Sequence, residues 1–325
     1  MLVDSLVEVS EEWLSSHVSG KKGGSCRLSP NVFEKLLTEL NSAFPVKRVA
    51  GGAAANTLSA LAVWGIHSRL AGVVGEDENG RLCLDTFRAA GGDVSSTKIR
   101  PGMPTKRCCC MITPDGERTM RVCLQSDSEL HPEELAPNDF ENVNFMLFEG
   151  FLLYNLPLTM RFFQLAEAHN VPIGMDLSSF ELVRSFRPCL LELASRCSVL
   201  FANNREICAF LQRDLSTPPQ NLLEEMLNYV PCCAMKLGKD GAIIGTRTQT
   251  CIVPAEKTRA IDTTGAGDNW AAGFLYGYLR NQPLSLCGRF AAAAAARVVS
   301  IRGARLSMAD LTALKQQFTI WETQK

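Results

Sequence analysis

The stretch that most constrains this 325-residue chain lies near its C-terminal end and reads Asp262-Thr263-Thr264-Gly265-Ala266-Gly267-Asp268. Apolar residues recur at helical spacing after Gly267, which predicts that a helix begins there. Upstream, residues 251–253 and 259–261 are expected to be extended. A glycine turn that leads into a helix N-terminus presents unpaired backbone N–H groups, and these suit a phosphate or another developing anion. The whole block is far more specific than a lone G-x-G.

Asp268 falls on the first turn of this predicted helix and allows two interpretations. Acidic residues in that position often do no more than stabilise the helix start. The sharper interpretation is a base that receives a hydroxyl proton beside a phosphate cradle. Gly265, Ala266 and Gly267 are small, so an anion can approach the backbone closely.

This block resembles the signature of the ribokinase (pfkB-type) carbohydrate and nucleoside kinases. The resemblance implies that Asp268 is the catalytic base and that Gly265, Ala266 and Gly267 form the anion hole for the transferred phosphoryl group. The adenosine-kinase-like branch is the most similar within that family.

A second signature lies about two hundred residues upstream, where Gly51-Gly52-Ala53-Ala54-Ala55-Asn56 precedes a predicted helix. Taken alone, the paired glycines fit a tight turn and Asn56 fits the surface. In the family, such glycines let a sugar lie against the backbone, and the Asn hydrogen-bonds its hydroxyls. Two signatures in the right order argue against coincidence.

The start of the chain departs from the family pattern, because Met1 falls where a first β-strand should already have ended. We therefore expect the central sheet to lack that strand. Residues 2–9 resemble the first strand of the family's lid, and Asp4 matches its sugar-binding Asp, although a solvated terminal charge is the alternative. A hairpin is predicted from 106–112 and 118–124 around a Thr-Pro-Asp-Gly-Glu turn. The lid is expected from segments 4–30 and 95–125.

From Phe145 onward, strands and helices alternate, which favours a parallel sheet covered on both faces. Strands are expected at 145–149, 171–176, 198–201 and 232–237, and helices at 157–169, 181–195, 203–212 and 219–229. The alanine run 291–296 predicts a close-packed helix. The predicted fold is one α/β domain over residues 1–325. It is a three-layer α/β/α ribokinase-like (Rossmann-like) arrangement, with a mostly parallel sheet and a small inserted β-sheet lid.

Asn203 and Glu206 match the family's Asn-x-x-Glu, whose residues hold Mg²⁺ through water and orient phosphates. Alone, the pair would more often be a helix cap with Glu at the third position, and both roles are compatible. The turn from Lys236 to Gly241 matches a nucleotide-side turn, but Lys236 stands where the family usually has Thr. The resemblance assigns nucleotide contacts to Gly238, Gly241 and Thr264.

By the same resemblance, Asp262, Thr264 and the loop at Gly303 are the residues that would hold a monovalent cation such as K⁺. Phe151 is predicted either to stack on a base or to be a core aromatic, with equal weight. ATP and Mg²⁺ are the expected cofactors. If the chain forms a homodimer, the lid is the expected contact.

The bulk properties exclude several classes. The net charge of −1 gives no case for nucleic acid or an anionic membrane. No window approaches the ~18 apolar residues of a membrane span, and no basic signal-like start is present, so we expect a cytoplasmic protein. Thirteen cysteines without any C-x-x-C pair are interpreted as reduced thiols. No P-loop motif of the type G-x-x-x-x-G-K-[ST] occurs.

The resulting prediction is transfer of the γ-phosphate of ATP to a primary hydroxyl of a ribonucleoside (adenosine-like) or sugar. Asp4, Gly51, Gly52, Asn56 and Phe151 are the candidate substrate residues. The alternatives are a free-sugar kinase of the ribose or fructose type, and a non-catalytic nucleotide- or sugar-binding relative.

Overall fold

The computed structural model describes residues 1–123 and 129–324, and its contacts divide the chain into two units. The first unit consists of Met1–Leu130, Thr258–Asn269 and Arg297–Ala313. The second consists of His131–Lys257, Trp270–Ala296 and Leu314–Lys325. Each unit is thus assembled from segments far apart in the sequence. Both signature motifs fall in the first unit.

The first unit contains a five-stranded sheet in the order β2-β7-β6-β1-β3. Its strands are β1 (Leu2–Glu8), β2 (Ser25–Arg27), β3 (Lys47–Gly51), β6 (Arg107–Ile112) and β7 (Arg118–Cys123). β1 runs parallel to β6 and antiparallel to β3. The predicted hairpin is confirmed, since β6 and β7 pair antiparallel and the Thr113 amide closes the turn on the Glu117 carbonyl at 3.0 Å. Leu124, the expected end of its second strand, lies outside the described residues.

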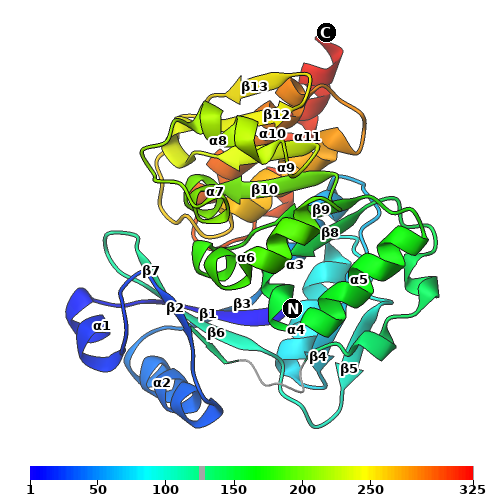
Figure 1. Cartoon of the computed structure of the whole chain (residues 1–325). Helices are drawn as coiled ribbons and strands as arrows, with labels where there is room; N and C mark the ends of the chain where they lie inside the picture. Colours follow the sequence, from blue (N-terminus) through cyan, green and yellow to red (C-terminus); the bar gives the residue numbers. More distant parts are fainter. Residues whose placement is uncertain (124–128, 325) are drawn as a thin grey trace. The chain divides into compact units, whose positions relative to one another are not determined.

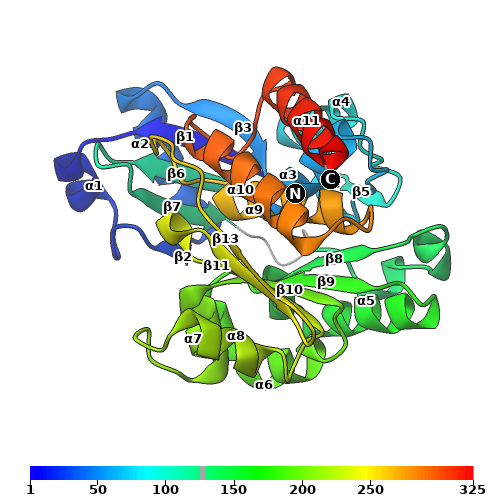
Figure 2. The same ribbon diagram turned by 90° about the horizontal axis from the view of Figure 1, so that it is seen from above.

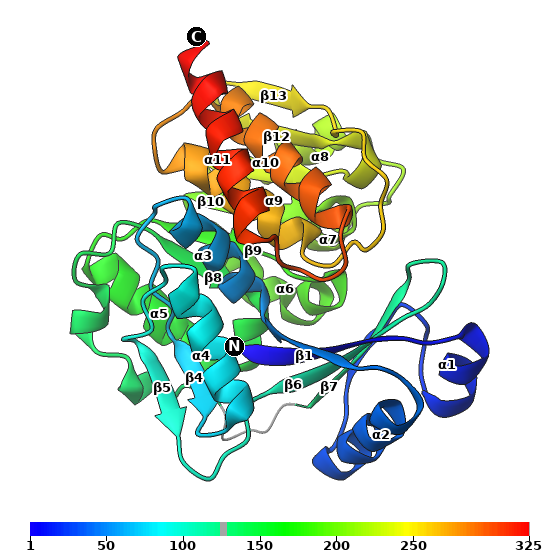
Figure 3. The ribbon, with the colours of Figure 1, turned by 180° about the vertical axis from the view of Figure 1, so that it is seen from behind.

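This sheet differs from the expected lid at two points. It includes β3, which lies outside both predicted segments, and it excludes β5 (Thr97–Arg100), which pairs with β4 (Gly72–Gly75) in a separate parallel pair. The helices α1 (Glu11–His17) and α2 (Pro30–Ala43) cover one face (Figure 3), where Leu14, Phe33 and Leu40 are buried against strand residues. Burial of these apolar side chains holds the helices on the sheet.

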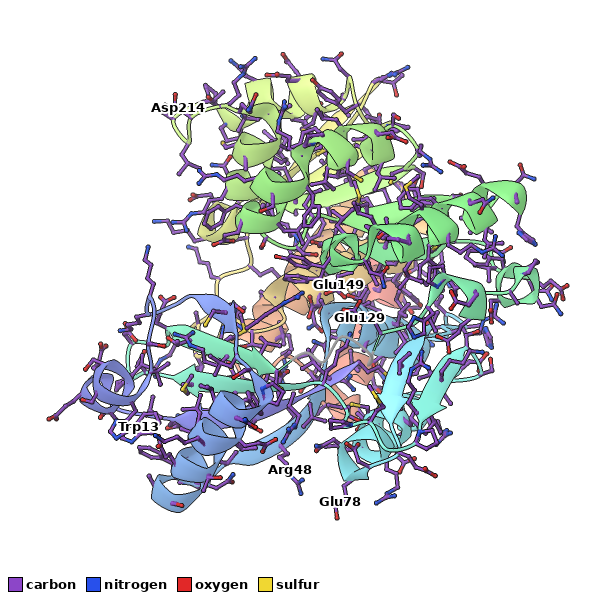
Figure 4. All side chains as sticks on the ribbon, turned by 60° about the horizontal axis from the view of Figure 1, so that its bottom comes forward. Trp13, Arg48, Glu78, Glu129, Glu149 and Asp214 are labelled. Carbon is purple, nitrogen blue, oxygen red and sulfur yellow. The ribbon has the colours of Figure 1, made fainter. Side chains whose placement is uncertain are left out.

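The remaining helices of the first unit are α3 (Ala53–Val63) and α4 (Glu78–Ala89). Asp77 caps α4, because its carboxylate accepts the Gly80 amide at 2.7 Å. Cys83 and Leu84 of α4 are buried with Val3 of β1. At the surface, Arg48 of β3 and Glu78 of α4 form an exposed ion pair at 3.7 Å (Figure 4), so α4 lies directly beside the β1–β3 edge of the sheet.

The second unit is built on a six-stranded sheet in the order β13-β12-β11-β10-β9-β8 (Figure 1). The strands are β8 (Met146–Glu149), β9 (Ile173–Asp176), β10 (Val199–Asn203), β11 (Cys232–Lys236), β12 (Ala242–Thr246) and β13 (Thr250–Val253). The four predicted strands and their parallel order are confirmed, whereas β12 and β13 pair antiparallel.

The helices that alternate with these strands are α5 (Leu156–Ala168), α6 (Phe180–Ala194), α7 (Asn204–Leu211) and α8 (Pro219–Met226). Within the second unit they cover one face of the sheet, and parts of α9 (Ala266–Tyr278) and α10 (Leu284–Val299) cover the other (Figure 2). Neighbouring residues of β12 show this division: Gly245 lies against Leu223 of α8, and Ile244 lies against Gly288 of α10. The three-layer α/β/α arrangement is therefore confirmed.

Two further helical features follow. The predicted alanine helix is α10, in which most of the run 291–296 is buried. The last helix is α11 (Met308–Thr323). The expected extended segment 259–261 is wrong, because these residues form no strand and Ile261 bonds the carbonyl of Val299 at 2.7 Å instead of a sheet neighbour.

The cysteines agree with the interpretation as reduced thiols. None of the thirteen cysteines, all of which lie in the described ranges, forms a disulfide. Burial raises the pKa of the Cys109 and Cys110 thiols to about 12, so both stay protonated and neutral. Among residues 1–123 and 129–324, no helix has the length and apolar character needed to cross a bilayer.

Candidate active site

The glycine turn of the first signature is confirmed and leads into α9, which begins at Ala266. Gly265 has φ 73°, and a Cβ there would lie 2.5 Å from the Ala304 carbonyl oxygen, so only glycine fits. The Asn269 side chain fastens the turn by donating to the carbonyls of Gly265 at 2.9 Å and Ala304 at 3.0 Å. The loop after α10 is thereby fixed against the start of α9.

Asp268 lies in the first turn of α9 and is hydrogen-bonded to the second signature. The Asn56 amide donates to Asp268 Oδ2 at 2.8 Å, and the Thr57 hydroxyl donates to the Asp268 carbonyl at 3.1 Å. Asn56 and Thr57 are both buried in the first turns of α3. Two motifs separated by 212 residues in the sequence are thus joined by a side-chain hydrogen bond. The alternative of a surface Asn56 is wrong.

Asp4 lies on β1, beside the glycine pair that ends β3. A Cβ at Gly51 would lie 2.1 Å from Asp4 Oδ2, so the absence of a side chain at this position makes room for the carboxylate. Burial raises the pKa of Asp4 from 3.8 to about 6, against the opposing effects of a Cys108 hydrogen bond and the nearby Arg118 and Arg305. This is not the solvated terminal charge that was the alternative.

Arg305, which the sequence patterns did not single out, lies in the same cluster. Its Nε donates to Asn56 Oδ1 at 2.9 Å, so Asn56 is held between Arg305 and Asp268. Its positive charge also acts on Asp4 and Asp268. The only sequence signal was its position two residues after Gly303, in a loop already linked to the site.

Asp262, Thr264 and Gly303 are brought together as predicted for a shared role. Asp262 is buried, and one of its oxygens accepts the Thr264 amide at 2.8 Å together with the Thr264 hydroxyl. The other oxygen accepts the Gly303 amide at 2.8 Å. Arg118 of β7 lies 3.8 Å from Asp262 and supplies an opposite charge.

In the second unit, Asn203 and Glu206 form a reciprocal capping box at the start of α7. Asn203 Oδ1 accepts the Glu206 amide at 3.0 Å, and the Glu206 carboxylate accepts both the Asn203 amide and its side-chain amide at 2.7 Å. Glu206 is 4% exposed, and burial raises its pKa despite the nearby Lys236. The predicted helix-capping role of Asn203 and Glu206 is therefore confirmed.

Lys236, the departure from the family pattern, pairs with Asp176 of β9 at 3.0 Å. Asp176 and Lys236 are the last residues of β9 and β11, two parallel strands that flank β10. Open α/β sheets bind their ligands at such carboxyl ends. A cavity of about 350 Å³ opens here. It is lined by Asn203, Asn204, Arg205, Pro219, Lys236, Leu237, Gly238 and Asp240.

The predicted site residues therefore fall into two groups. The first unit holds Asp4, Gly51, Gly52, Asn56, Asp262, Thr264, Gly265, Ala266, Gly267, Asp268 and Gly303. The second unit holds Phe151, Asn203, Glu206, Gly238 and Gly241. Phe151 is 49% exposed, so it is not a core aromatic. In the described ranges, no group of three His, Cys, Asp or Glu residues could hold a metal directly.

The fold and this arrangement define a ribokinase-like α/β phosphotransferase that acts on an alcohol group. The chain belongs to the pfkB family of carbohydrate kinases, whose family model matches residues 25–311. It is 28% identical over 260 residues to an ATP-dependent ribose-1-phosphate kinase of Halopiger xanaduensis, covering 80% of this chain and 83% of that protein.

Two further similarities follow the same line. A nucleoside kinase of Methanothermobacter thermautotrophicus is 27% identical over 289 residues, which is 86% of this chain and 89% of that protein. The crystal structure of the adenosine kinase from Sinorhizobium meliloti matches with a TM-score of 0.87 and 28% identity, covering 97% of this chain and 96% of that one. These relatives differ in the acceptors that their names state.

Proposed function

We propose that the chain transfers the γ-phosphate of ATP to a primary hydroxyl of a ribonucleoside or a sugar. The observation that carries this proposal is the hydrogen bond between Asn56 and Asp268. It sets a carboxylate that can accept a proton beside an amide that can bind hydroxyls, at the start of a helix whose first amides favour an anion.

In this mechanism Asp4, Gly51, Gly52 and Asn56 hold the acceptor and orient its hydroxyl. Asp268 accepts the hydroxyl proton as the oxygen attacks the γ-phosphorus in line, and the bond from the γ-phosphorus to the bridging oxygen breaks so that ADP leaves. The backbone of Gly265, Ala266 and Gly267 stabilises the charge on the transferred group. Asp4 contributes a carboxyl whose raised pKa lets it donate or accept a hydrogen bond near neutral pH.

Residues of the second unit supply the nucleotide contacts in this proposal. Gly238 and Lys236 line the cavity at the strand ends, and Gly241 closes the same turn. The family resemblance also implies a nucleotide contact for Thr264. Asn203 and Glu206 would hold Mg²⁺ through water, because their side chains already bond one another and direct ligation would break the helix cap. The ion supplies charge neutralisation of the phosphates when bound. Phe151, exposed, stays a candidate platform for a base.

We assign no step to a monovalent cation. Both oxygens of Asp262 accept hydrogen bonds from the chain, and the Arg118 guanidinium supplies the counter-charge at 3.8 Å. These hydrogen bonds hold the loop at Gly303 in place. Because they already occupy the Asp262 oxygens, the site fits a hydrogen-bonded turn better than it fits K⁺. The lack of disulfides among the thirteen cysteines of the described ranges supports a reducing compartment, so we propose the cytoplasm as the site of the reaction. A homodimer through the lid stays a prediction.

The function is tested by measuring ADP formation from MgATP with a panel of acceptors, in parallel with an assay that lacks any acceptor. The panel contains adenosine and other ribonucleosides, ribose, fructose, glucose, and their phosphorylated or oxidised forms. We expect at least one acceptor to raise ADP formation by orders of magnitude over the acceptor-free rate. Lack of acceleration by every compound would favour the non-catalytic relative. Acceleration by free sugars alone would favour the free-sugar kinase.

A further inference from the structure

The Arg305 side chain carries hydrogen-bonding capacity that the protein does not use. A guanidinium has five N–H donors in a rigid planar fork. In Arg305, Nε donates to the neutral Asn56 amide oxygen at 2.9 Å. The Nη2 atom is buried and has no hydrogen-bond partner within the described part of the chain. A buried donor on a charged group is costly unless an acceptor reaches it.

The position of this donor places it beside the residues proposed to bind the phosphoryl acceptor. Arg305 shares Asn56 with Asp268, the proposed base, and its charge acts on Asp4 and Asp268. Burial lowers the pKa of Arg305, but an arginine stays charged inside proteins, so the cation persists. Asp4 is a poor permanent counter-ion, because burial raises its pKa to about 6.

Two kinds of substrate group can accept a hydrogen bond from Nη2 of Arg305. A sugar hydroxyl can accept one N–H but leaves the buried charge uncompensated. A phosphate or carboxylate offers two oxygens that share a negative charge, and it matches the guanidinium fork in geometry and in sign. The second solution removes both costs at once.

We propose that Arg305 recognises a negative charge on the acceptor, so that the preferred substrates are anionic sugars that carry a phosphate or a carboxylate. This inference rests on the proposed phosphotransferase function and narrows its substrate class. Neutral nucleosides and neutral sugars are then weak substrates, because they leave the Arg305 fork unfilled.

The test compares matched pairs of acceptors with MgATP: ribose against ribose 1-phosphate and ribose 5-phosphate, and glucose against gluconate. We expect kcat/KM to be at least tenfold higher for the anionic member of at least one pair. The sugar phosphates and gluconate together show whether a phosphate or a carboxylate is recognised. Binding of ribose 5-phosphate and gluconate without ATP, measured by calorimetry, gives a readout that does not depend on turnover.

Arg305→Gln should lower kcat/KM for the preferred anionic acceptor about 10–100-fold, mainly through KM. The loss for the neutral acceptor should be much smaller and reflects only the lost bond from Arg305 to Asn56. Arg305→Lys keeps the charge but loses the planar fork, so its kcat/KM for the anionic acceptor should lie between those of wild type and Arg305→Gln. Arg302→Gln is the matched control, since Arg302 is an exposed arginine of the same loop that pairs with Glu8. Thermal melts confirm that each variant is folded.

Three results would overturn the inference while the phosphotransferase function stands. The first is a wild-type preference for the neutral member of every pair. The second is an Arg305→Gln variant that loses neutral and anionic acceptors equally. The third is an anion affinity that the substitution leaves unchanged. If no acceptor of any kind is phosphorylated, the proposed function itself falls.

Discussion

The charged side chains around Lys236 and those around Arg305 are satisfied in opposite ways. In the second unit, Lys236 pairs with Asp176 at 3.0 Å and Glu206 is enclosed in its own capping box. In the first unit, Arg305 bonds a neutral amide, keeps an unpartnered Nη2, and leaves Asp4 with a raised pKa. Charges satisfied within the protein support structure, whereas charges left incomplete mark the place where a ligand must supply the missing partner.

The largest expected effect concerns Asp268. Asp268→Asn keeps the size of the side chain and can still accept the Asn56 hydrogen bond, but it cannot take a proton. We expect turnover to fall ~10²–10⁴-fold, with acceptor and ATP affinities nearly unchanged. Steady-state kinetics and direct binding measurements check this. Asp214→Asn, at an exposed loop acid labelled in Figure 4, is the control and should keep full turnover.

The next effect compares a glycine in each unit. Gly265 and Gly238 both have positive φ, 73° and 63°, so alanine strains the backbone by about 1 kcal/mol at each. At Gly265 the new Cβ also meets Ala304, which adds about 1–3 kcal/mol, whereas nothing lies within 4 Å at Gly238. Urea denaturation should show the larger loss for Gly265→Ala, together with loss of turnover. Equal losses would mean that the turn at Gly265 tolerates a side chain.

A third effect depends on pH. The pKa of Asp4 rises from 3.8 to about 6 on folding, so the folded state retains this proton to higher pH than the unfolded chain does. Its contribution to stability is present below about pH 4 and is lost as the pH rises through 6. Asp4→Asn removes this dependence. The free energy of unfolding of the variant should therefore gain about 3 kcal/mol relative to wild type between pH 4 and 7. A pH-independent difference would contradict the buried carboxyl.

The smallest effect is expected at Lys236. Lys236→Met breaks the pair with Asp176, and because both side chains are partly exposed we expect about 1 kcal/mol of lost stability. The KM for ATP should rise several-fold and the KM for the acceptor should not change, the reverse of Arg305→Gln. Lys239→Met, an exposed lysine of the same turn that does not line the cavity, is the control. An altered acceptor KM would contradict the division of roles.

Much of this arrangement could be predicted because local patterns encode it. The strand and helix alternation after Phe145, the hairpin around Asp115 and the start of α9 all follow from periodicity and turn residues. The Asn203–Glu206 cap was predicted as one of two compatible roles, and the hydrogen bonds show it. These features depend on residues close together in the chain.

What could not be predicted depends on residues far apart. Arg305 meets Asn56 across 249 positions, and Arg118 meets Asp262 through the pairing of β7 in the sheet. The pair of Lys236 with Asp176 has no local sequence signal, because it needs β9 and β11 to flank β10. The residue types of segment 259–261 favour an extended strand. The segment is a loop, in which the Ile261 amide donates to the Val299 carbonyl.

In the proposed reaction, the cluster around Asp268 directs a phosphoryl group to a hydroxyl of a small acceptor. The most direct test follows the γ-phosphate itself, with ATP labelled at that position and the acceptor that gives the fastest ADP formation. We predict that the label appears in the acceptor in a one-to-one ratio with ADP and that it resides on an ester of a primary hydroxyl. Label released as inorganic phosphate, or ADP formed at the same rate without acceptor, would contradict the account.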